Sequence, residues 1–429
     1  MWVIVRLAFK AYFRKIYLID RDKIPKKGAL VMTPNHPSAF MEACLLACFQ
    51  PRSLYFLVRG DIFSNPRFLP FLRGTHQVPI FRARDGFSNL RKNDETFRFC
   101  YLTLSLKRTV VIFPESRTIW EKRLRPIQKG AAKLSFGAMK NHPGLDLKIV
   151  PVGVNFEDPR KFQSDIVIRF GDPIDLASYL EEYEEHPQQA ISNVSNELGA
   201  RMEKLVYILG DKEKENAFNL AEEMYRNSFH SNQSSIFEYH YERFSEGKRL
   251  SSYFNSDGGN SFRAQVEDYQ EILEVKKIKD IHVCQSGMPF WKNLLSVIFS
   301  TPLWVVGLIL TSAPAFISNK ITGSKVKDQA FVGPVKISLG ILLYSVYFSL
   351  ATILFISLCG WYGLILTIIL MSLAYFVART HFHHLNTWES IYFMITNRVS
   401  MDELRLKRNS IIDQMHQIIF DENSIANAN

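Results

Sequence analysis

The longest stretch of this sequence without a charged side chain runs from residue 337 to residue 378. It holds 42 residues, and none of them is Asp, Glu, Lys or Arg. As one helix it would reach roughly 63 Å, about twice the thickness of the hydrocarbon core of a bilayer. The run should therefore fold back on itself, and Cys359-Gly360-Trp361-Tyr362-Gly363 near its middle is the place for a turn. Buried core helices of a large soluble protein are the alternative, but so long an uncharged run is typical of a membrane protein.

A second uncharged run covers residues 293–319 and contains Pro302 and Pro314. Both flanks of 337–378 carry more Lys and Arg than Asp and Glu, and the positive-inside rule places such flanks in the cytoplasm. We therefore expect 337–378 to form a two-helix hairpin, and 293–319 to enter the membrane as a re-entrant or in-plane segment without crossing it. Three full spans with the C-terminus outside are the competing arrangement.

The N-terminal segment 1–28 is strongly basic. Residues 1–27 carry eight Lys or Arg side chains against two Asp, with apolar residues such as Leu7 and Phe13 among them. This pattern indicates an amphipathic helix that contacts the membrane interface, although a helix packed on the neighbouring domain would look similar. Because cations interrupt the apolar residues, we expect no cleavable signal peptide.

Short apolar runs rich in β-branched residues follow from residue 29 onward. They alternate with segments long enough for helices, such as 39–49 and 128–140, which predicts an α/β catalytic domain over residues 29–177. Its sheet should be mixed, largely buried and flanked by helices. The expected strands are 29–34, 53–58, 77–81, 109–113, 148–154 and 165–170.

The rest of the chain divides by composition. Residues 178–290 are charged and amphipathic without similar strand-like runs, so we expect a helical insert there. The membrane region with its helices is expected over 291–378, and residues 379–429 should form a cytoplasmic C-terminal tail.

Charge and cysteine content narrow the possible partners. The 52 Lys and Arg residues outnumber the 42 Asp and Glu residues, which favours anionic partners such as phospholipid surfaces and phosphorylated substrates. Nucleic acid is a poor candidate, since the basic clusters lie beside membrane-like segments. The five cysteines include no CxxC pair, which argues against a disulfide scaffold or a thiolate zinc site.

Asn35-His36-Pro37-Ser38 directly follows the first expected strand, and Glu42 lies six positions after His36. A histidine with a nearby carboxylate is the minimum unit for general-base catalysis, because the acid fixes the tautomer and stabilises the imidazolium that forms. Along a regular helix six positions would turn Glu42 about 240° away from His36, so the chain must bend first. Pro37, with Ser38 as a helix N-cap, could supply that bend. A purely structural histidine is the alternative interpretation.

Three further segments follow other expected strands. They are Val78-Pro79-Ile80-Phe81-Arg82, then Phe113-Pro114-Glu115-Ser116-Arg117 with Lys129-Gly130-Ala131 after it, and finally Val150-Pro151-Val152-Gly153. Arginine at a strand end matters because its planar guanidinium binds phosphate through two parallel hydrogen bonds. For each arginine alone, a surface ion pair is the alternative.

Taken in order, the four segments resemble the motifs of the PlsC-like glycerolipid acyltransferases, which include the lysophosphatidate acyltransferases. That family shows a His-x4-Asp motif, a strand ending in Arg, an FPEGxR motif and an apolar strand containing proline. The segments here are NHPSAFME, VPIFR, FPESR and VPVG, spread over about residues 28–175. The phrases LVRGDIF, RLRPIQKGAAKLS and VPVGVNFED resemble the bacterial branch that has a C-terminal membrane region. Two positions depart from the pattern: Glu42 replaces the Asp one residue further along, and Ser116 replaces the Gly.

The resemblance implies an O-acyltransferase of phospholipid biosynthesis. His36 would take the proton from an acceptor hydroxyl that attacks an acyl thioester, and Glu42 would orient His36. The residues assigned by the resemblance to the acceptor and its phosphate are Arg82, Glu115, Arg117 and Lys129. The remaining motif residues are Asn35, Pro114, Gly130 and Pro151.

The resemblance also suggests the substrates. The acceptor would be lysophosphatidate, with glycerol 3-phosphate or an amino-acid lipid as alternatives, and the donor would be acyl-CoA or acyl-acyl carrier protein. No cofactor or metal is implied. Because acyl thioesters are made in the cytoplasm, the catalytic domain should lie on the cytoplasmic face of a bacterial-type inner membrane.

Two other classes of protein stay open. His381-Phe382-His383-His384, after the last apolar run, could belong to a metal-dependent lipid oxidase or desaturase, but such enzymes need several histidine clusters and the sequence contains only this one. A membrane scaffold that has kept the fold and lost catalysis is the second class, because of the departures at Glu42 and Ser116.

Overall fold

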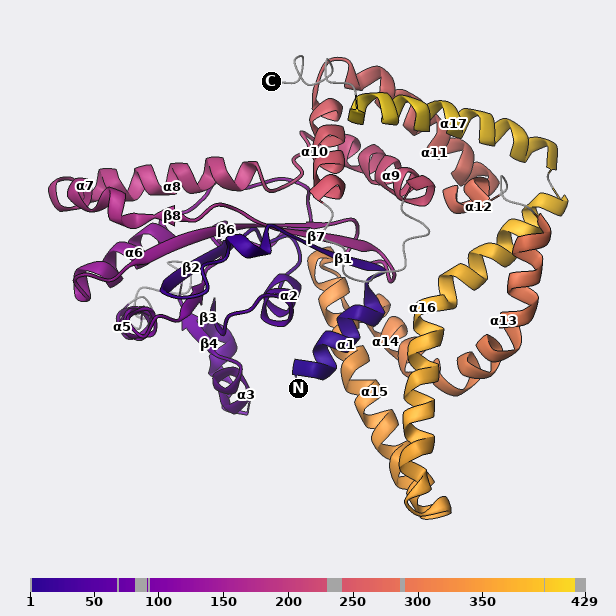
Figure 1. The fold of residues 1–429 in the computed structure, drawn as a ribbon, viewed down its shortest axis with the longest axis horizontal. Helices are drawn as coiled ribbons and strands as arrows, with labels where there is room; N and C mark the ends of the chain where they lie inside the picture. The colour runs from indigo at the N-terminus through magenta and orange to yellow at the C-terminus, as the bar shows by residue number, and fades with distance from the viewer. Residues whose placement is uncertain are drawn as a thin grey trace.

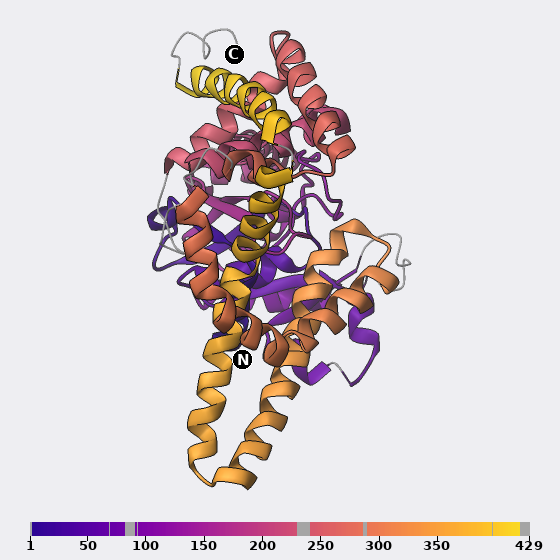
Figure 2. The same cartoon turned by 90° about the vertical axis from the view of Figure 1, so that its right-hand side faces the viewer.

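The computed structural model describes residues 2–67, 69–81, 91, 93–229, 241–285, 290–396 and 398–420. Figure 1 shows three parts: an α/β domain built on a sheet, a helical domain above it, and long helices that extend away from both. Figure 2, turned by 90°, shows two of the long helices as a hairpin that reaches beyond the rest of the molecule.

The sheet of the α/β domain contains eight strands in the described residues. Across the sheet they are β1 (Lys15–Ile19), β7 (Asp165–Phe170), β6 (Leu147–Phe156), β2 (Ala29–Pro34), β5 (Thr109–Val111), β3 (Leu54–Arg59) and β4 (Gln77–Ile80), and β8 (Ile174–Asp175) pairs with β6. β6 is antiparallel to β7 and β8, and the other pairs are parallel. This mixed sheet, flanked by helices, confirms the fold class predicted from the sequence.

Helices cover both faces of the sheet, because alternate side chains of each strand point to opposite faces. In β2, Leu30 and Met32 belong to the core on one face, and Ala29 and Val31 belong to the core on the other. The first core is completed by α1 (Trp2–Tyr12) and α2 (Met41–Phe49), and the second by α5 (Asn93–Ser105), α6 (Gly130–Asn141) and α8 (Pro187–Glu203). Short helices at connections are α3 (Leu69–Gly74), α7 (Leu180–Glu185) and the 3₁₀ turns Arg21–Lys23, Gly60–Ser64 and Leu176–Tyr179.

The predicted N-terminal helix over 1–28 is too long. α1 ends at Tyr12, and the residues from Lys15 to Ile19 form β1, buried along their whole length beside β7. The strand was not predicted, because cations flank this short apolar segment and its partner strand lies far away in the sequence. α1 itself is amphipathic: Phe9 and Tyr12 are buried, whereas the exposed apolar residues are Trp2, Val3, Ile4 and Leu7.

The helical domain is built from segments that precede the membrane region in the sequence and from one segment that follows it. Its helices are α9 (Lys212–Phe229), α10 (Tyr241–Asn255), α11 (Gly259–Lys276), α12 (Asp280–Gln285) and α17 (Arg398–Phe420). They share one core, in which Phe218, Phe254 and Tyr269 lie with Ile411 and Met415 of α17.

Two predicted boundaries change as a result. The segment predicted as a tail over 379–429 contains the end of a long helix and then α17, whose apolar residues recur at helical spacing and are buried in the helical domain. At the other end, α8 falls in the predicted insert but packs on the sheet through Val194 and Leu198. The α/β domain therefore extends beyond residue 177.

The membrane region consists of α13 (Phe290–Thr311), α14 (Ala313–Lys325), α15 (Gln329–Cys359) and α16 (Tyr362–Thr396). Within the described residues, α15 and α16 are long and apolar enough to cross a membrane, and the bent pair α13–α14 could be a third span. α15 and α16 are separated at Gly360, which has a positive φ of 61°. α13 and α14 meet at an angle of 62° at the break before Pro314, whereas Pro302 lies inside α13 without ending it.

Both ends of the α15–α16 hairpin contact the α/β domain. At the start of α15, Nζ of Lys336 donates a hydrogen bond to the carbonyl of Arg160 (3.0 Å), and Arg160 donates one to Oε1 of Gln329 (2.9 Å). Along α16, the guanidinium of Arg379 donates to the carbonyl of Phe13 (2.8 Å) at the end of α1. The turn at Gly360 lies at the opposite end of the hairpin (Figure 2).

Candidate active site

His36 and Glu42 lie beside each other at the carboxyl end of β2. Nδ1 of His36 is 3.8 Å from Oε2 of Glu42, and the side chain of Glu42 is fully buried. Neither of these two atoms has a hydrogen-bond partner in the described part of the chain. A separation of 3.8 Å exceeds the range of a hydrogen bond but is short enough for an ion pair when His36 is protonated.

The bend that brings Glu42 to His36 is made by Ala39, which has a positive φ of 45°. The predicted N-cap role of Ser38 is wrong, since α2 begins at Met41 and its first turn has no side-chain cap. Instead, the backbone N–H of Ser38 donates a hydrogen bond to Oε1 of Glu42. One carboxylate oxygen of Glu42 is thus fixed by the backbone, and the other faces the imidazole.

Glu115 connects the loop after β5 to His36. Its Oε1 accepts the backbone N–H of His36 (2.7 Å), and its Oε2 accepts the backbone N–H of Arg125 (3.2 Å). Burial raises the pKa of Glu115, while these two N–H groups and the charge of Arg125 act in the opposite direction. The next residue, Ser116, adopts a positive φ of 58°, the backbone conformation that glycine prefers.

The remaining motif residues build the sheet edge around this pair. Asn35 forms two hydrogen bonds with the backbone of Val154, at 2.6 and 3.1 Å, and so fixes the end of β2 against β6. Pro151 lies opposite Thr33 in the register of these two strands. The carbonyl of Pro114 accepts the N–H of Gln128 (2.9 Å), which closes the loop just before Gly130 begins α6.

The predicted phosphate-binding cations are only partly brought together. Arg117 is exposed in the Glu115 loop, and its backbone carbonyl accepts a hydrogen bond from Arg125 (3.2 Å). Lys129 is also exposed, and its Nζ donates to Oγ of Ser192 on α8 (2.7 Å). Arg82 lies outside the described residues. The residue before it, Phe81, donates its N–H to Oδ1 of Asn93 (2.9 Å) and accepts a hydrogen bond from Nδ2 of Asn93 at its carbonyl (2.8 Å).

The histidines after the last apolar run lie away from this edge, on α16. Nε2 of His384 contacts Oγ of Ser300 (2.7 Å), and its ring stacks on Trp304 of α13. Among the described residues, no group of three or more His, Cys, Asp or Glu side chains could hold a metal ion. The contacts of His384 therefore join α16 to α13.

Comparison with known proteins identifies the domain that carries this edge. Residues 15–155 match the Acyltransferase family model, and the match runs from the start of β1 nearly to the end of β6. Residues 15–155 are thus similar to acyltransferase domains, including those of glycerolipid acyltransferases. The likeness to this family predicted from the sequence is therefore confirmed.

Two curated relatives are yeast proteins. Glycerol-3-phosphate O-acyltransferase 1 of Saccharomyces cerevisiae is 25% identical over 248 residues, which are 54% of this chain and 32% of that protein. Glycerol-3-phosphate O-acyltransferase 2 of the same yeast is 33% identical over 103 residues, 24% of this chain and 14% of that protein. The chain thus spans about a third or less of the length of these relatives.

A solved structure also aligns with part of the chain. It is the crystal structure of PlsC, the 1-acyl-sn-glycerophosphate acyltransferase of Thermotoga maritima, with 17% identity and a TM-score of 0.30. The alignment covers 46% of this chain and 79% of that one.

Three residues of the acyltransferase domain that contact this edge were not singled out as site residues from the sequence. Phe113 stacks on the ring of His36, with centroids 4.1 Å apart and an angle of 26°. Arg125 supplies an N–H to Glu115 and contacts the carbonyl of Arg117. Lys122, in the same loop, is buried although the sequence around it is highly charged. Phe113 stands in the FPESR motif and Arg125 in the phrase RLRPIQKGAAKLS, whereas no local pattern marks Lys122.

Proposed function

We propose that this protein transfers a fatty acyl group from an acyl thioester to a hydroxyl of a lysophosphatidate-type glycerolipid, with His36 as general base. The observation that carries the proposal is the buried carboxylate of Glu42 facing Nδ1 of His36 at 3.8 Å. With a proton on Nδ1, directed at Glu42, the lone pair on Nε2 is free to accept the proton of the acceptor hydroxyl.

The reaction balances without a further reactant. The hydroxyl oxygen attacks the thioester carbonyl while His36 takes the hydroxyl proton, and a C–O bond forms. The tetrahedral intermediate then collapses with cleavage of the C–S bond. The leaving thiolate takes the proton back from the imidazolium, so His36 is regenerated and no cofactor is consumed.

The acceptor phosphate is assigned to cations around the Glu115 loop. Arg117 is exposed beside Glu115, which holds the backbone N–H of His36, and Lys129 is exposed where the same loop ends. Their charges are the reason for assigning them to the acceptor phosphate. We include Arg82 from its place after β4. Replacing Arg117 by alanine should raise the KM for the acceptor more than the KM for the donor.

Glycerol 3-phosphate is the second candidate acceptor. It is favoured by the names of the two yeast relatives, which are glycerol-3-phosphate O-acyltransferases. Acyl-CoA and acyl-acyl carrier protein are both retained as candidate donors, since each presents the same thioester to the site.

The deciding experiment measures acyl transfer in membranes that contain the protein. Each donor is combined with 1-acylglycerol 3-phosphate and with glycerol 3-phosphate, and the lipid products are separated. His36→Ala should lower turnover by about 10²–10⁴-fold, the usual contribution of a positioned base. His142→Ala is the matched control, because His142 lies at the opposite end of α6 from the Glu115 loop. Near-normal turnover in His36→Ala would refute the mechanism, and transfer to neither acceptor would refute the proposed function.

We also propose that the acyltransferase domain lies on the cytoplasmic face of a bacterial-type membrane. The support is that α15 leaves and α16 returns to the α/β domain, with Lys336 and Arg379 bound there. The exposed apolar side chains along the hairpin, including Leu350, Ile353 and Ile368, then face lipid. In this arrangement the α13–α14 pair enters the membrane and returns to the same side.

Cysteine labelling in intact cells tests this orientation. Cys359 is exposed at the end of α15 and should react with an impermeant maleimide from outside, whereas Cys359→Ser should not. In the Cys359→Ser background, a cysteine introduced at Ser324, near the end of α14, should react only after the cells are opened. Labelling of Ser324→Cys from outside would favour three full spans instead.

A further inference from the structure

Lys122 is a buried cation in the loop between β5 and α6, and its ammonium group is held from two parts of the molecule. Its Nζ donates to the carbonyl of Phe156 at the end of β6 (2.8 Å) and to Oε2 of Glu222 on α9 (3.0 Å). The ring of Phe218, also on α9, lies 5.1 Å from the same nitrogen. Its side chain is 5% exposed, so all of these contacts are shielded from water.

The backbone of Lys122 is held by the same region. Its N–H lies 3.4 Å from Oε2 of Glu215 on α9, and its carbonyl accepts the N–H of Leu209 (2.8 Å). Side chain, N–H and carbonyl of one residue are thus bound by the segment that starts the helical domain. A surface lysine would not be anchored at all three points.

Glu222 is shared between Lys122 and a second buried cation. Its Oε1 accepts a hydrogen bond from Arg243 of α10 (2.8 Å), while its Oε2 accepts the one from Lys122. Although burial alone would raise the pKa of Glu222, Lys122 and Arg243 hold that pKa below its usual value. The carboxylate therefore stays ionised and fixes both cations.

A short series of contacts leads from Lys122 to His36. Three residues after Lys122, Arg125 donates its backbone N–H to Glu115, and its guanidinium donates to the carbonyl of Arg117. Glu115 in turn accepts the N–H of His36. Asn35, Pro37, Lys122 and Tyr207 also line one small pocket, so this loop, the His36 turn and the helical domain meet at one place.

We propose that Lys122 is a positioning residue through which the helical domain holds the Glu115–Arg117 loop in its acceptor-binding conformation. The acceptor-binding role of the loop rests on the proposed function, whereas the loop conformation can be measured without any substrate. Lys122 does not touch the reacting atoms and acts only through Arg125 and Glu115.

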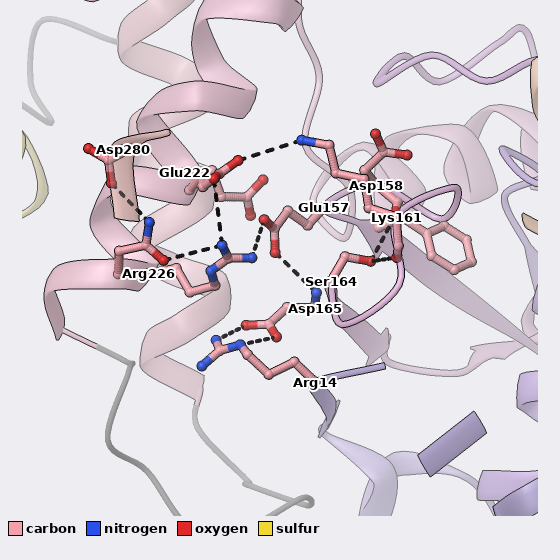
Figure 3. A network of polar contacts seen from close by, with 12 residues as sticks. Arg14, Glu157, Asp158, Lys161, Ser164, Asp165, Glu222, Arg226 and Asp280 are labelled. Atoms are coloured by element: carbon pink, nitrogen blue, oxygen red, sulfur yellow. Dashed lines mark hydrogen bonds and ion pairs between the residues drawn. The ribbon is translucent and has the colours of Figure 1, made fainter. Parts of the chain in front are cut away.

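A second buried connection supplies the control. Arg226 of α9 is paired with Glu157 after β6, and the other oxygen of Glu157 accepts the N–H of Asp165 (3.0 Å), which is itself paired with Arg14 (Figure 3). The side chain of Arg226 is 14% exposed, so this ion pair is similarly buried. It joins α9 to the same sheet, and among the described residues the hydrogen bonds of Arg226 go to Glu157 and Asn227 rather than to the Glu115 loop.

The experiment compares Lys122→Met with Arg226→Met in the full-length protein in detergent. Hydrogen exchange of peptides covering 114–128 should become at least tenfold faster in Lys122→Met, because the N–H groups of Arg117, Arg125 and Gln128 lose their fixed partners. In Arg226→Met the same peptides should exchange as in the wild type, even if thermal unfolding shows an equal loss of stability. Unchanged exchange in Lys122→Met, or equal acceleration in both variants, would overturn the proposal.

Steady-state kinetics test whether the loop binds the acceptor rather than the donor. Lys122→Met should raise the acceptor KM by at least tenfold and leave the donor KM within twofold, and Lys122→Arg should recover part of the loss. If Lys122→Met does not fold, Glu222→Gln makes the same comparison, because it weakens the anchor without changing the size of the side chain. A change of both KM values together would reduce Lys122 to a structural residue. Wild-type protein without transfer activity would contradict the proposed function, while the exchange result would still decide the role of Lys122.

Discussion

Replacing Glu42 by glutamine isolates the electrostatic part of the proposed pair. The amide oxygen of glutamine can still accept the N–H of Ser38, so the turn at Ala39 is retained. The charge that faces Nδ1 of His36 is removed, and the amide nitrogen placed there is a hydrogen-bond donor. His36 would then keep its proton on Nε2, the atom that has to act as the base.

The size of the effect follows from the distance. Two unit charges 3.8 Å apart interact by about 4 kcal/mol at an effective dielectric constant of 20. Each 1.4 kcal/mol is a factor of ten in rate, so losing all of it would slow the reaction by about 10³-fold. Because neighbouring dipoles recover part of this energy, we expect kcat to fall by about 10²-fold in Glu42→Gln.

The assay is steady-state acyl transfer at saturating donor, with acceptor concentration varied. The acceptor KM should change little, since the acceptor phosphate is assigned to other residues. Glu42→Asp moves the carboxylate back by about one C–C bond, 1.5 Å, and should give a kcat between those of wild type and Glu42→Gln. A fully active and folded Glu42→Gln would refute the reasoning, because another group would then orient His36.

Three further changes test the framework around this pair. Gly153→Ala should cost about 1–3 kcal/mol in thermal unfolding, because the new methyl would lie 2.0 Å from the carbonyl of Leu205, whereas Gly199→Ala in α8 meets only ordinary contacts and should be neutral or stabilising. Ser116→Gly should stabilise the protein by up to about 1 kcal/mol by the same measurement, since glycine relieves the positive φ, and a loss of stability would show that the hydroxyl is needed. The pKa of Glu222 is lower in the folded than in the unfolded state, so its ionised form stabilises the fold above about pH 4.5, and this stabilisation is lost as the pH falls further. Glu222→Gln should therefore weaken the dependence of the unfolding free energy on acid pH. An unchanged pH profile in this variant would contradict the buried network.

Most of the sheet could be predicted from the sequence, because buried parallel strands are continuous apolar runs between turn residues. β2 and β7 coincide with the expected ranges, and four other strands agree to within a few residues. β1 could not be predicted in the same way. Lys15 opens it and is 3% exposed, charged residues flank its short apolar run, and its partner strand β7 lies far along the chain.

In the candidate site, too, some residues could be predicted from the local sequence and others could not. His36 follows the end of β2 and Glu42 lies six positions later, so the local sequence was enough to propose this pair, whereas Glu115 was assigned through the resemblance. The contact between His36 and Glu42 depends on the positive φ of Ala39. This backbone conformation could not be predicted from the sequence, because alanine rarely adopts it. The burial of Lys122 could not be predicted, because a lysine in a charged loop is ordinarily exposed. Its buried ammonium group is paired with Glu222, whose side chain comes from the helical domain.

The direction of β6 explains why the site and the membrane helices share one edge of the sheet. β2 and β6 run parallel, so the end of β6 lies beside His36, and β7 and β1, which run the opposite way, begin at this same edge. From β2 to β1 there are three strand spacings, about 14 Å. The contacts of α15 and α16 with the α/β domain are made there, through Arg160 after β6 and Phe13 before β1. A lipid whose acyl chain stays beside these helices could therefore present its polar end to His36 without leaving the membrane surface, which is what the proposed reaction on a lysophosphatidate-type acceptor requires.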